Sequence, residues 1–100
     1  MPSLLIDDIR KVGTDAIART SKEAFELLAQ QEWTELYIDH DLGEDVTGYD
    51  IVVWMLENPA IKNPEFVQIV SSNPVGRENI AKALISYGYT RKSVIDFYLN

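Results

Sequence analysis

The chain has 100 residues, of which 46% are hydrophobic and 25% are charged, a composition typical of a single globular domain over residues 1–100 and not of a disordered segment. Its formal net charge of −7 excludes a general nucleic-acid surface, because binding along a phosphate backbone requires many lysine and arginine side chains. The sequence has no cysteine, which excludes disulfides and thiolate chemistry, and no apolar run approaches the roughly 20 residues of a membrane span.

The first part of the chain predicts short strands around one helix. Residues 3–6 form an apolar run that predicts a buried strand, and Gly13 indicates that residues 9–14 are a loop. Residues 16–19 are a candidate second strand. A parallel crossover usually needs about a dozen residues, so this short link leaves three alternatives: a parallel edge strand reached by a bare loop, an antiparallel strand, or no strand. A T-x-x-E capping box then predicts a helix over residues 21–31.

The rest of the chain alternates strands and helices more clearly. Each helix has a recognisable start or stop in the sequence: a threonine N-cap, a proline stop, an asparagine–proline start and a glycine stop. Alternating elements of this kind imply a mostly parallel sheet with right-handed crossovers. We therefore predict an α/β three-layer sandwich of four or five mostly parallel strands. The expected strands are residues 35–39, 66–70 and 94–99, and the expected helices run from Thr47 to about Pro59 and from Asn73 to Gly88.

Four aspartates stand at the ends of two predicted strands. Asp7 and Asp8 close the first run, and Asp39 and Asp41 close the middle one, with His40 between them. The carboxyl ends of parallel strands form the edge where ligands bind, and a buried carboxylate needs a cation, a donor or a proton to offset its desolvation. The pattern predicts an acidic pocket in which all four aspartates are candidate ligands of Mg²⁺ or Mn²⁺. Alternatively, one acid of each pair caps a turn and only the other faces the pocket.

The polar turn before the last predicted helix is a second candidate site. Ser71, Ser72 and Asn73 precede a helix whose free N–H groups and dipole favour an anion. Gly76 would let a phosphate approach closely, and Arg77 could add a bidentate contact. These five residues are therefore candidate phosphate ligands. The alternative is structural, since asparagine–proline is a good helix opener and serines are common in turns.

Three stretches of the sequence resemble a known family. They are Asp7-Asp8, then D-H-D-L-G over residues 39–43 with T-G-Y-D over residues 47–50, and finally S-S-N-P-V-G-R over residues 71–77. The layout is similar to that of response-regulator receiver domains, and the three stretches resemble more closely the cyclic-phosphate processing receiver domains. The resemblance implies a receiver-like (flavodoxin-like) fold in which the first and last receiver helices are missing.

The same resemblance implies an activity, namely metal-assisted processing of terminal 2′,3′-cyclic phosphates on RNA or nucleotides. It places the protein in RNA repair or phage-related conflict, in the cytoplasm of a bacterial or phage-infected cell. The candidate catalytic residues are then Asp39, Asp8 and His40, with His40 assisting proton transfer. The protein would be a cyclic phosphodiesterase or phosphohydrolase acting on a phosphorylated small ligand or an RNA end. The family usually has a histidine directly before the serine of its third motif, where this chain has Val70.

Two alternatives to an enzyme remain. Val70 favours a catalytically degenerate receiver-like module that binds a phosphorylated ligand or a protein partner without turnover. A receiver that signals through an aspartyl phosphate is disfavoured, because receivers have a lysine at the end of the fifth strand and this chain ends that run at Leu99-Asn100. The sequence leaves the oligomeric state open.

Overall fold

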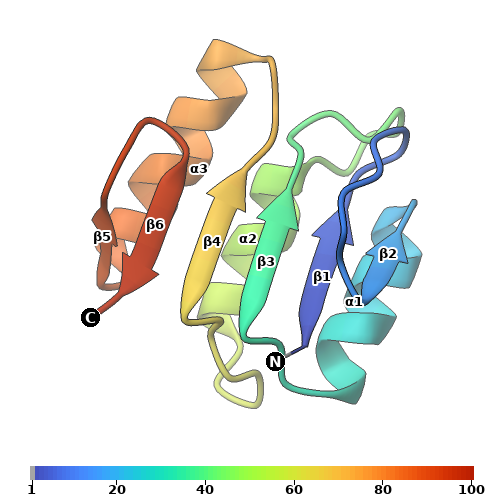
Figure 1. Ribbon diagram of the computed structural model, residues 1–100, viewed down its shortest axis with the longest axis horizontal. Coiled ribbons are helices and arrows are strands. Elements are labelled where there is room, and N and C mark those ends of the chain that lie inside the picture. The colour runs from blue at the N-terminus through green and yellow to red at the C-terminus, as the bar shows by residue number, and fades with distance from the viewer. Residues whose placement is uncertain (1) are drawn as a thin grey trace.

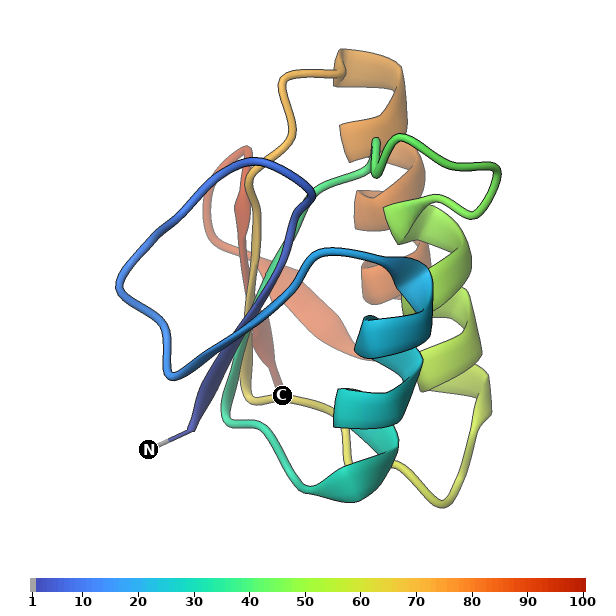
Figure 2. The same ribbon diagram turned by 90° about the vertical axis from the view of Figure 1, so that its right-hand side faces the viewer.

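The computed structural model describes residues 2–100, and in this range one six-stranded sheet carries three helices on a single face (Figures 1 and 2). The strand order is β2-β1-β3-β4-β6-β5. The elements are β1 (Ser3–Ile6), β2 (Ala16–Ala18), α1 (Ser21–Gln30), β3 (Glu35–Ile38), α2 (Gly48–Glu57), β4 (Phe66–Ile69), α3 (Pro74–Ser86), β5 (Tyr89–Arg91) and β6 (Asp96–Leu99).

The α/β, receiver-like fold predicted from the sequence is confirmed. Strands β2, β1, β3 and β4 are parallel neighbours, as expected for strands joined by crossovers. Two details are corrected. Within residues 2–100 the sheet and its helices form two layers and not three, because all three helices lie on the same face of the sheet (Figure 2). The sheet of the described residues has six strands, where the sequence predicted four or five.

Strand β2 is parallel to β1 although no helix connects them, which decides among the three alternatives left by the sequence. Residues 7–15 return over the uncovered face of the sheet as a loop (Figure 2). Side chains fix both ends of this loop. Asp15 Oδ2 accepts from the Ser3 N–H at 2.9 Å, and the Arg19 guanidinium donates to the Asp7 carbonyl at 3.1 Å and to the Arg10 carbonyl at 2.5 Å. A bare loop can therefore make the crossover because its ends are tied to β1 and β2.

The chain ends in an antiparallel hairpin that the sequence did not predict. Strand β5 forms the sheet edge, and β6 runs back between β5 and β4. Gly88, with φ of 104°, makes the turn from α3 into β5 in a conformation that favours glycine. The C-terminus consequently lies at the end of the sheet opposite to the carboxyl ends of β1 and β3 (Figure 1).

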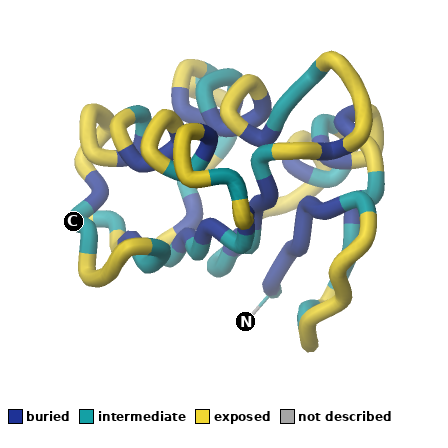
Figure 3. Tube along the Cα trace, turned by 90° about the horizontal axis from the view of Figure 1, so that it is seen from above, coloured by how far each residue is buried: buried dark blue, intermediate teal, exposed yellow. Residues whose placement is uncertain are grey.

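The core lies between the helices and one face of the sheet. Seen from above, the buried positions are on the strands and on the side of each helix that faces the sheet, and the exposed helix positions are on the opposite side (Figure 3). No helix within residues 2–100 is both long and apolar enough to cross a membrane. Buried residues alternate with less buried ones along β3 and β4, as expected for a sheet with one face on the core, whereas all four residues of β1 are buried. The strand residues that face the helices include Leu4, Ile6, Leu36, Ile38, Val67, Ile69 and Phe97.

The loop between β3 and α2 folds back onto the end of β3. The Gly48 N–H donates to the His40 carbonyl at 2.8 Å. A Cβ atom at Gly48 would lie 1.9 Å from the carbonyl oxygen of Asp39. Thr47 and Asp50 form a capping box immediately around this contact. Only glycine therefore lets α2 begin directly against the residue that closes β3.

We expect Gly48→Ala to lower the free energy of unfolding by about 3 kcal/mol or more, because the clash is with rigid backbone atoms. Urea denaturation measures the change. Gly13→Ala is the matched control, since a Cβ there meets nothing within 4 Å. That control should be neutral or stabilising by up to about 1 kcal/mol. Equal stabilities of the two variants would show that the close approach at Gly48 is not required.

Candidate metal and phosphate site

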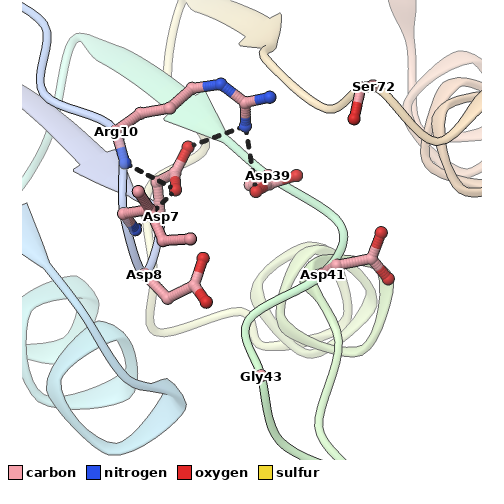
Figure 4. A pocket seen from close by; sticks show the side chains of 8 residues that line it. Asp7, Asp8, Arg10, Asp39, Asp41, Gly43 and Ser72 are labelled. Atoms are coloured by element: carbon pink, nitrogen blue, oxygen red, sulfur yellow. Dashed lines mark hydrogen bonds and ion pairs between the residues drawn. The ribbon is translucent and has the colours of Figure 1, made fainter.

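Asp7, Asp8 and Asp39 come together at the carboxyl ends of β1 and β3 (Figure 4). One carboxylate oxygen from each lies within 4.8 Å of the others. Asp7 and Asp39 are 0% and 6% exposed, whereas Asp8 is half-buried. The Asp39 N–H donates to the Ile6 carbonyl at 2.9 Å, which holds the two strand ends side by side. Three of the four aspartates proposed as metal ligands thus form one cluster.

The buried Asp7 carboxylate is compensated mainly by its own loop. Burial by itself would raise the pKa of Asp7, but the N–H groups of Ile9 and Arg10, each 3.0 Å from Oδ1, and the Arg10 guanidinium outweigh it and lower the pKa below the ordinary value. Asp7 therefore remains ionised. The turn formed by Asp7 with these two N–H groups also directs the Arg10 side chain back toward the strand ends.

Arg10 joins the two buried acids. Its Nη1 atom lies 3.1 Å from Asp7 Oδ2 and 3.0 Å from Asp39 Oδ2. The sequence did not point to this residue, because an arginine in a loop is ordinarily solvated. One feature of the sequence could have indicated the ion pair: a basic residue stands three positions after an acid that was expected to be buried.

These groups line an open pocket of about 480 Å³. Its wall includes Gly43, whose φ of 71° favours glycine, and a Cβ there would lie 3.2 Å from Asp8 Oδ2. Ile9 and Gly43, like Arg10, were not predicted to be part of the site. The complete lining is Asp7, Asp8, Ile9, Arg10, Asp39, Asp41, Gly43 and Ser72.

Asp41 lines the pocket but lies outside the three-acid cluster. Its side chain is 64% exposed, and its carboxylate contacts His40 Nδ1 at 3.1 Å and Asn73 Nδ2 at 3.3 Å. The hydrogen bonds from His40 and Asn73 lower the pKa of Asp41. Instead of joining the other aspartates, Asp41 links the β3–α2 loop to the start of α3. The structure therefore does not place it with the other three proposed metal ligands.

His40 packs against the first turn of α3 and does not line the pocket. A Cβ at Gly76 would lie 2.4 Å from Cγ of the His40 ring, so the absence of a side chain at Gly76 is what makes room for the imidazole. The His40 side chain is only 16% exposed. His40 is connected to the pocket only through its hydrogen bond with Asp41, which does line it.

Of the five predicted phosphate ligands, Ser72 alone lines the pocket. The others build the turn into α3. The Ser71 hydroxyl accepts from the Asn73 N–H at 3.1 Å, and Asn73 Oδ1 accepts from the Gly76 N–H at 3.0 Å. Arg77 Nη1 donates to the Ser71 carbonyl at 3.2 Å. The structural alternative given for this turn thus accounts for the side-chain contacts of Ser71 and Asn73.

Glu44 connects the β3–α2 loop to the start of α1. Its carboxylate accepts from the Ser21 N–H at 2.9 Å and from the Ser21 hydroxyl at 2.5 Å, at the N-terminus of α1. These hydrogen bonds, that of the hydroxyl first, lower the pKa of Glu44. A carboxylate at a helix N-terminus also interacts favourably with the helix dipole. The β3–α2 loop is therefore held at both α1 and α3.

The donor set of the cluster fits a hard divalent cation. Asp7, Asp8 and Asp39 offer three carboxylates with oxygen ligands, the type that Mg²⁺ and Mn²⁺ prefer. Figure 4 shows Asp8 directed toward the pocket on the side away from Arg10. A buried acidic cluster that could hold a metal is thus present. Its three aspartates follow β1 and β3, two parallel strands that are neighbours in the sheet.

A family model described as the Cyclic-phosphate processing Receiver domain matches residues 3–86. The match extends from β1 to the end of α3, so it includes all of the pocket and the turn before α3 but not the C-terminal hairpin. Comparisons with curated proteins and with solved structures find no match.

The packing of His40 on Gly76 generates a stability prediction. In the otherwise unchanged protein, Gly76→Ala should lower the free energy of unfolding by about 1–3 kcal/mol, because the methyl group would overlap the imidazole. In a His40→Ala background the same change should be far less harmful, since the space is then free and alanine is the better helix former. A double-mutant cycle by urea denaturation measures this coupling. Equal effects in the two backgrounds would contradict the contact.

The Glu44 contacts predict how stability depends on pH. A carboxyl whose pKa is lowered by folding stabilises the protein above its ordinary pKa of 4.5, and this contribution is lost as the pH falls through the folded value. Glu44→Gln should therefore lower the melting temperature at neutral pH, and the difference from the unmodified protein should shrink in acid. The control is Glu57→Gln at an exposed position of α2. A difference that persists unchanged in acid would exclude the carboxylate as its cause.

Proposed function

The chain belongs to the cyclic-phosphate processing receiver domain family, and we propose that it opens terminal 2′,3′-cyclic phosphates on RNA or nucleotides with the help of a divalent cation. The observation that carries this proposal is the convergence of Asp7, Asp8 and Asp39 in one pocket with Ser72 on its wall. The family match supports the substrate class, and the acidic cluster supports the need for a cation.

The charge of the pocket explains why a cation is required. The three clustered carboxylates and the Arg10 guanidinium carry a formal net charge of −2, and Asp41 on the pocket wall adds a further negative charge. This charge repels a phosphate diester anion and attracts a divalent cation. When bound, Mg²⁺ or Mn²⁺ would polarise the phosphate and lower the pKa of a water. Asp7, Asp8 and Asp39 would hold the cation. The Ser72 hydroxyl would donate a hydrogen bond to a phosphate oxygen.

The proposed reaction is hydrolysis. A water oxygen forms a bond to phosphorus, one of the two ester P–O bonds breaks, and the departing ribose oxygen takes up a proton. The product is a phosphate monoester with a free neighbouring hydroxyl. Asp39 is suited to accept a proton from the water, and the His40–Asp41 pair is the proposed source of the proton for the leaving group.

A second candidate function is binding without turnover. It is favoured by Val70, which stands where the family resemblance leads us to expect a histidine. It is also favoured by His40, whose ring packs under α3 and meets the pocket only through Asp41. A degenerate module of this kind would keep the acidic cluster for a cation and a phosphorylated ligand or RNA end, or use the same fold for a protein partner.

The two functions are separated by incubating the protein with 2′,3′-cyclic nucleotides and with cyclic-phosphate-ended RNA, in Mg²⁺, Mn²⁺ or chelator. Under the enzymatic proposal, product forms only with the metal. Asp39→Asn should then lower the rate by at least about a hundredfold, the scale expected for loss of one catalytic group. Asp45→Asn, an exposed change in the β3–α2 loop, is the control and should retain activity.

Ligand binding without product in every metal would favour the module. An Asp39→Asn protein that turns over at the full rate would remove Asp39 from the mechanism. Chromatography of the nucleotide products, with phosphate position assigned by ³¹P NMR, would also show which ester bond is broken.

A further inference from the structure

The guanidinium of Arg10 lies between the two buried carboxylates of the pocket (Figure 4). A single nitrogen, Nη1, donates to both Asp7 Oδ2 and Asp39 Oδ2. These acids belong to the same cluster that fits a divalent cation. One positive group is therefore already shared by two of the three carboxylates that a metal would need.

Arg10 is also the one cationic side chain among the residues that line this pocket within residues 2–100. Neither Arg77, which donates to the Ser71 carbonyl, nor Arg19, which donates to loop carbonyls, lines the pocket. A phosphate that enters the pocket can consequently meet only one arginine there. Guanidinium groups bind phosphate through paired hydrogen bonds, as they bind carboxylates.

The backbone of Arg10 is fixed while its side chain is not enclosed. The Arg10 N–H donates to Asp7 Oδ1 at 3.0 Å, and its carbonyl accepts from Arg19. The side chain is 41% exposed, so the guanidinium borders open solvent. Rotation about the side-chain bonds alone can thus carry it from the acids toward the mouth of the pocket.

We propose that Arg10 is a displaceable counter-ion. Its guanidinium bridges Asp7 and Asp39 until a divalent cation takes these carboxylates, and it then turns to bind the phosphate of the substrate. This inference rests on the cation site of the proposed function and adds an order of events: the cation binds first, and its binding frees the arginine that the phosphate requires. The ion pairs broken in the first step are replaced by ion pairs to phosphate in the second.

The first test is Mn²⁺ affinity, measured by calorimetry and by the EPR signal of free Mn²⁺ at constant ionic strength. Arg10→Gln should bind Mn²⁺ about tenfold more tightly than the unmodified protein, because two charge-assisted hydrogen bonds no longer have to be broken. Lys11→Gln removes the same charge from the next residue of the loop, and its affinity should stay within about twofold because exposed charges are screened.

The second test uses the unmodified protein, so it does not depend on the folding of a variant. In ¹⁵N NMR the Arg10 side-chain nitrogen signals should shift when Mg²⁺ is added, and those of Arg91, which pairs with Glu78, should not. With saturating Mg²⁺, inorganic phosphate should bind Arg10→Gln about tenfold more weakly than the unmodified protein, as expected for the loss of a charge-assisted contact.

The outcomes separate this inference from the proposed function. Equal Mn²⁺ affinities of the Arg10 and Lys11 variants, or Arg10 signals that Mg²⁺ leaves unchanged, would overturn the role of Arg10 and leave the cation site standing. Absence of Mn²⁺ binding in all of the proteins would overturn both. Tighter Mn²⁺ binding together with weaker phosphate binding in Arg10→Gln supports the displacement.

Discussion

The structure of the pocket depends on the cost of burying two carboxyl groups at the edge of a parallel sheet. Asp7 and Asp39 are almost completely buried, and an unpaired charge in that position would destabilise the fold. The loop after β1 compensates them with backbone N–H donors and with the Arg10 guanidinium. The turn after β1 and the direction of the Arg10 side chain follow from this requirement. The same arrangement concentrates negative charge where a cation can bind.

Three glycines give the family's sequence motifs a physical meaning. Gly43 adopts a positive φ beside Asp8, Gly48 passes against the carbonyl of Asp39, and Gly76 lies against the ring of His40. Each allows backbone or an imidazole to approach where a Cβ would intrude. Gly43 therefore sets the spacing between the β3–α2 loop and Asp8, Gly48 the spacing between α2 and the end of β3, and Gly76 the spacing between α3 and His40. This explains why changes at positions that bear no functional group should affect the site.

The sequence predicted the strand ends and the acidic cluster because both follow from short-range rules. Apolar runs indicate buried strands, and the carboxyl ends of parallel strands share one edge. It did not predict β5, since three residues with one buried tyrosine carry little periodicity. It also did not predict the partners of Arg10 or Glu44, because a charged loop residue is ordinarily solvated and only the path of the chain brings it to a buried acid or a helix N-terminus. The roles of Ser71, Asn73 and Arg77 were ambiguous in the sequence. The hydrogen-bonding groups that cap a helix are of the same kind as those that bind a phosphate.

The two departures from a receiver are connected through the position of positive charge. In the receiver pattern a lysine at the end of the last strand supplies a cation at the acidic edge, but here β6 runs in the opposite direction and ends at the far side of the sheet. The helix that receivers have after their first strand is replaced here by the loop of residues 7–15, and this loop begins with the turn that carries Arg10. A lysine beyond a parallel strand would be separate from the carboxylates in sequence and free to contact a phosphorylated aspartate. Arg10 is instead tied to the carboxylates themselves, so under the proposed displacement its availability to a phosphate depends on what those carboxylates hold.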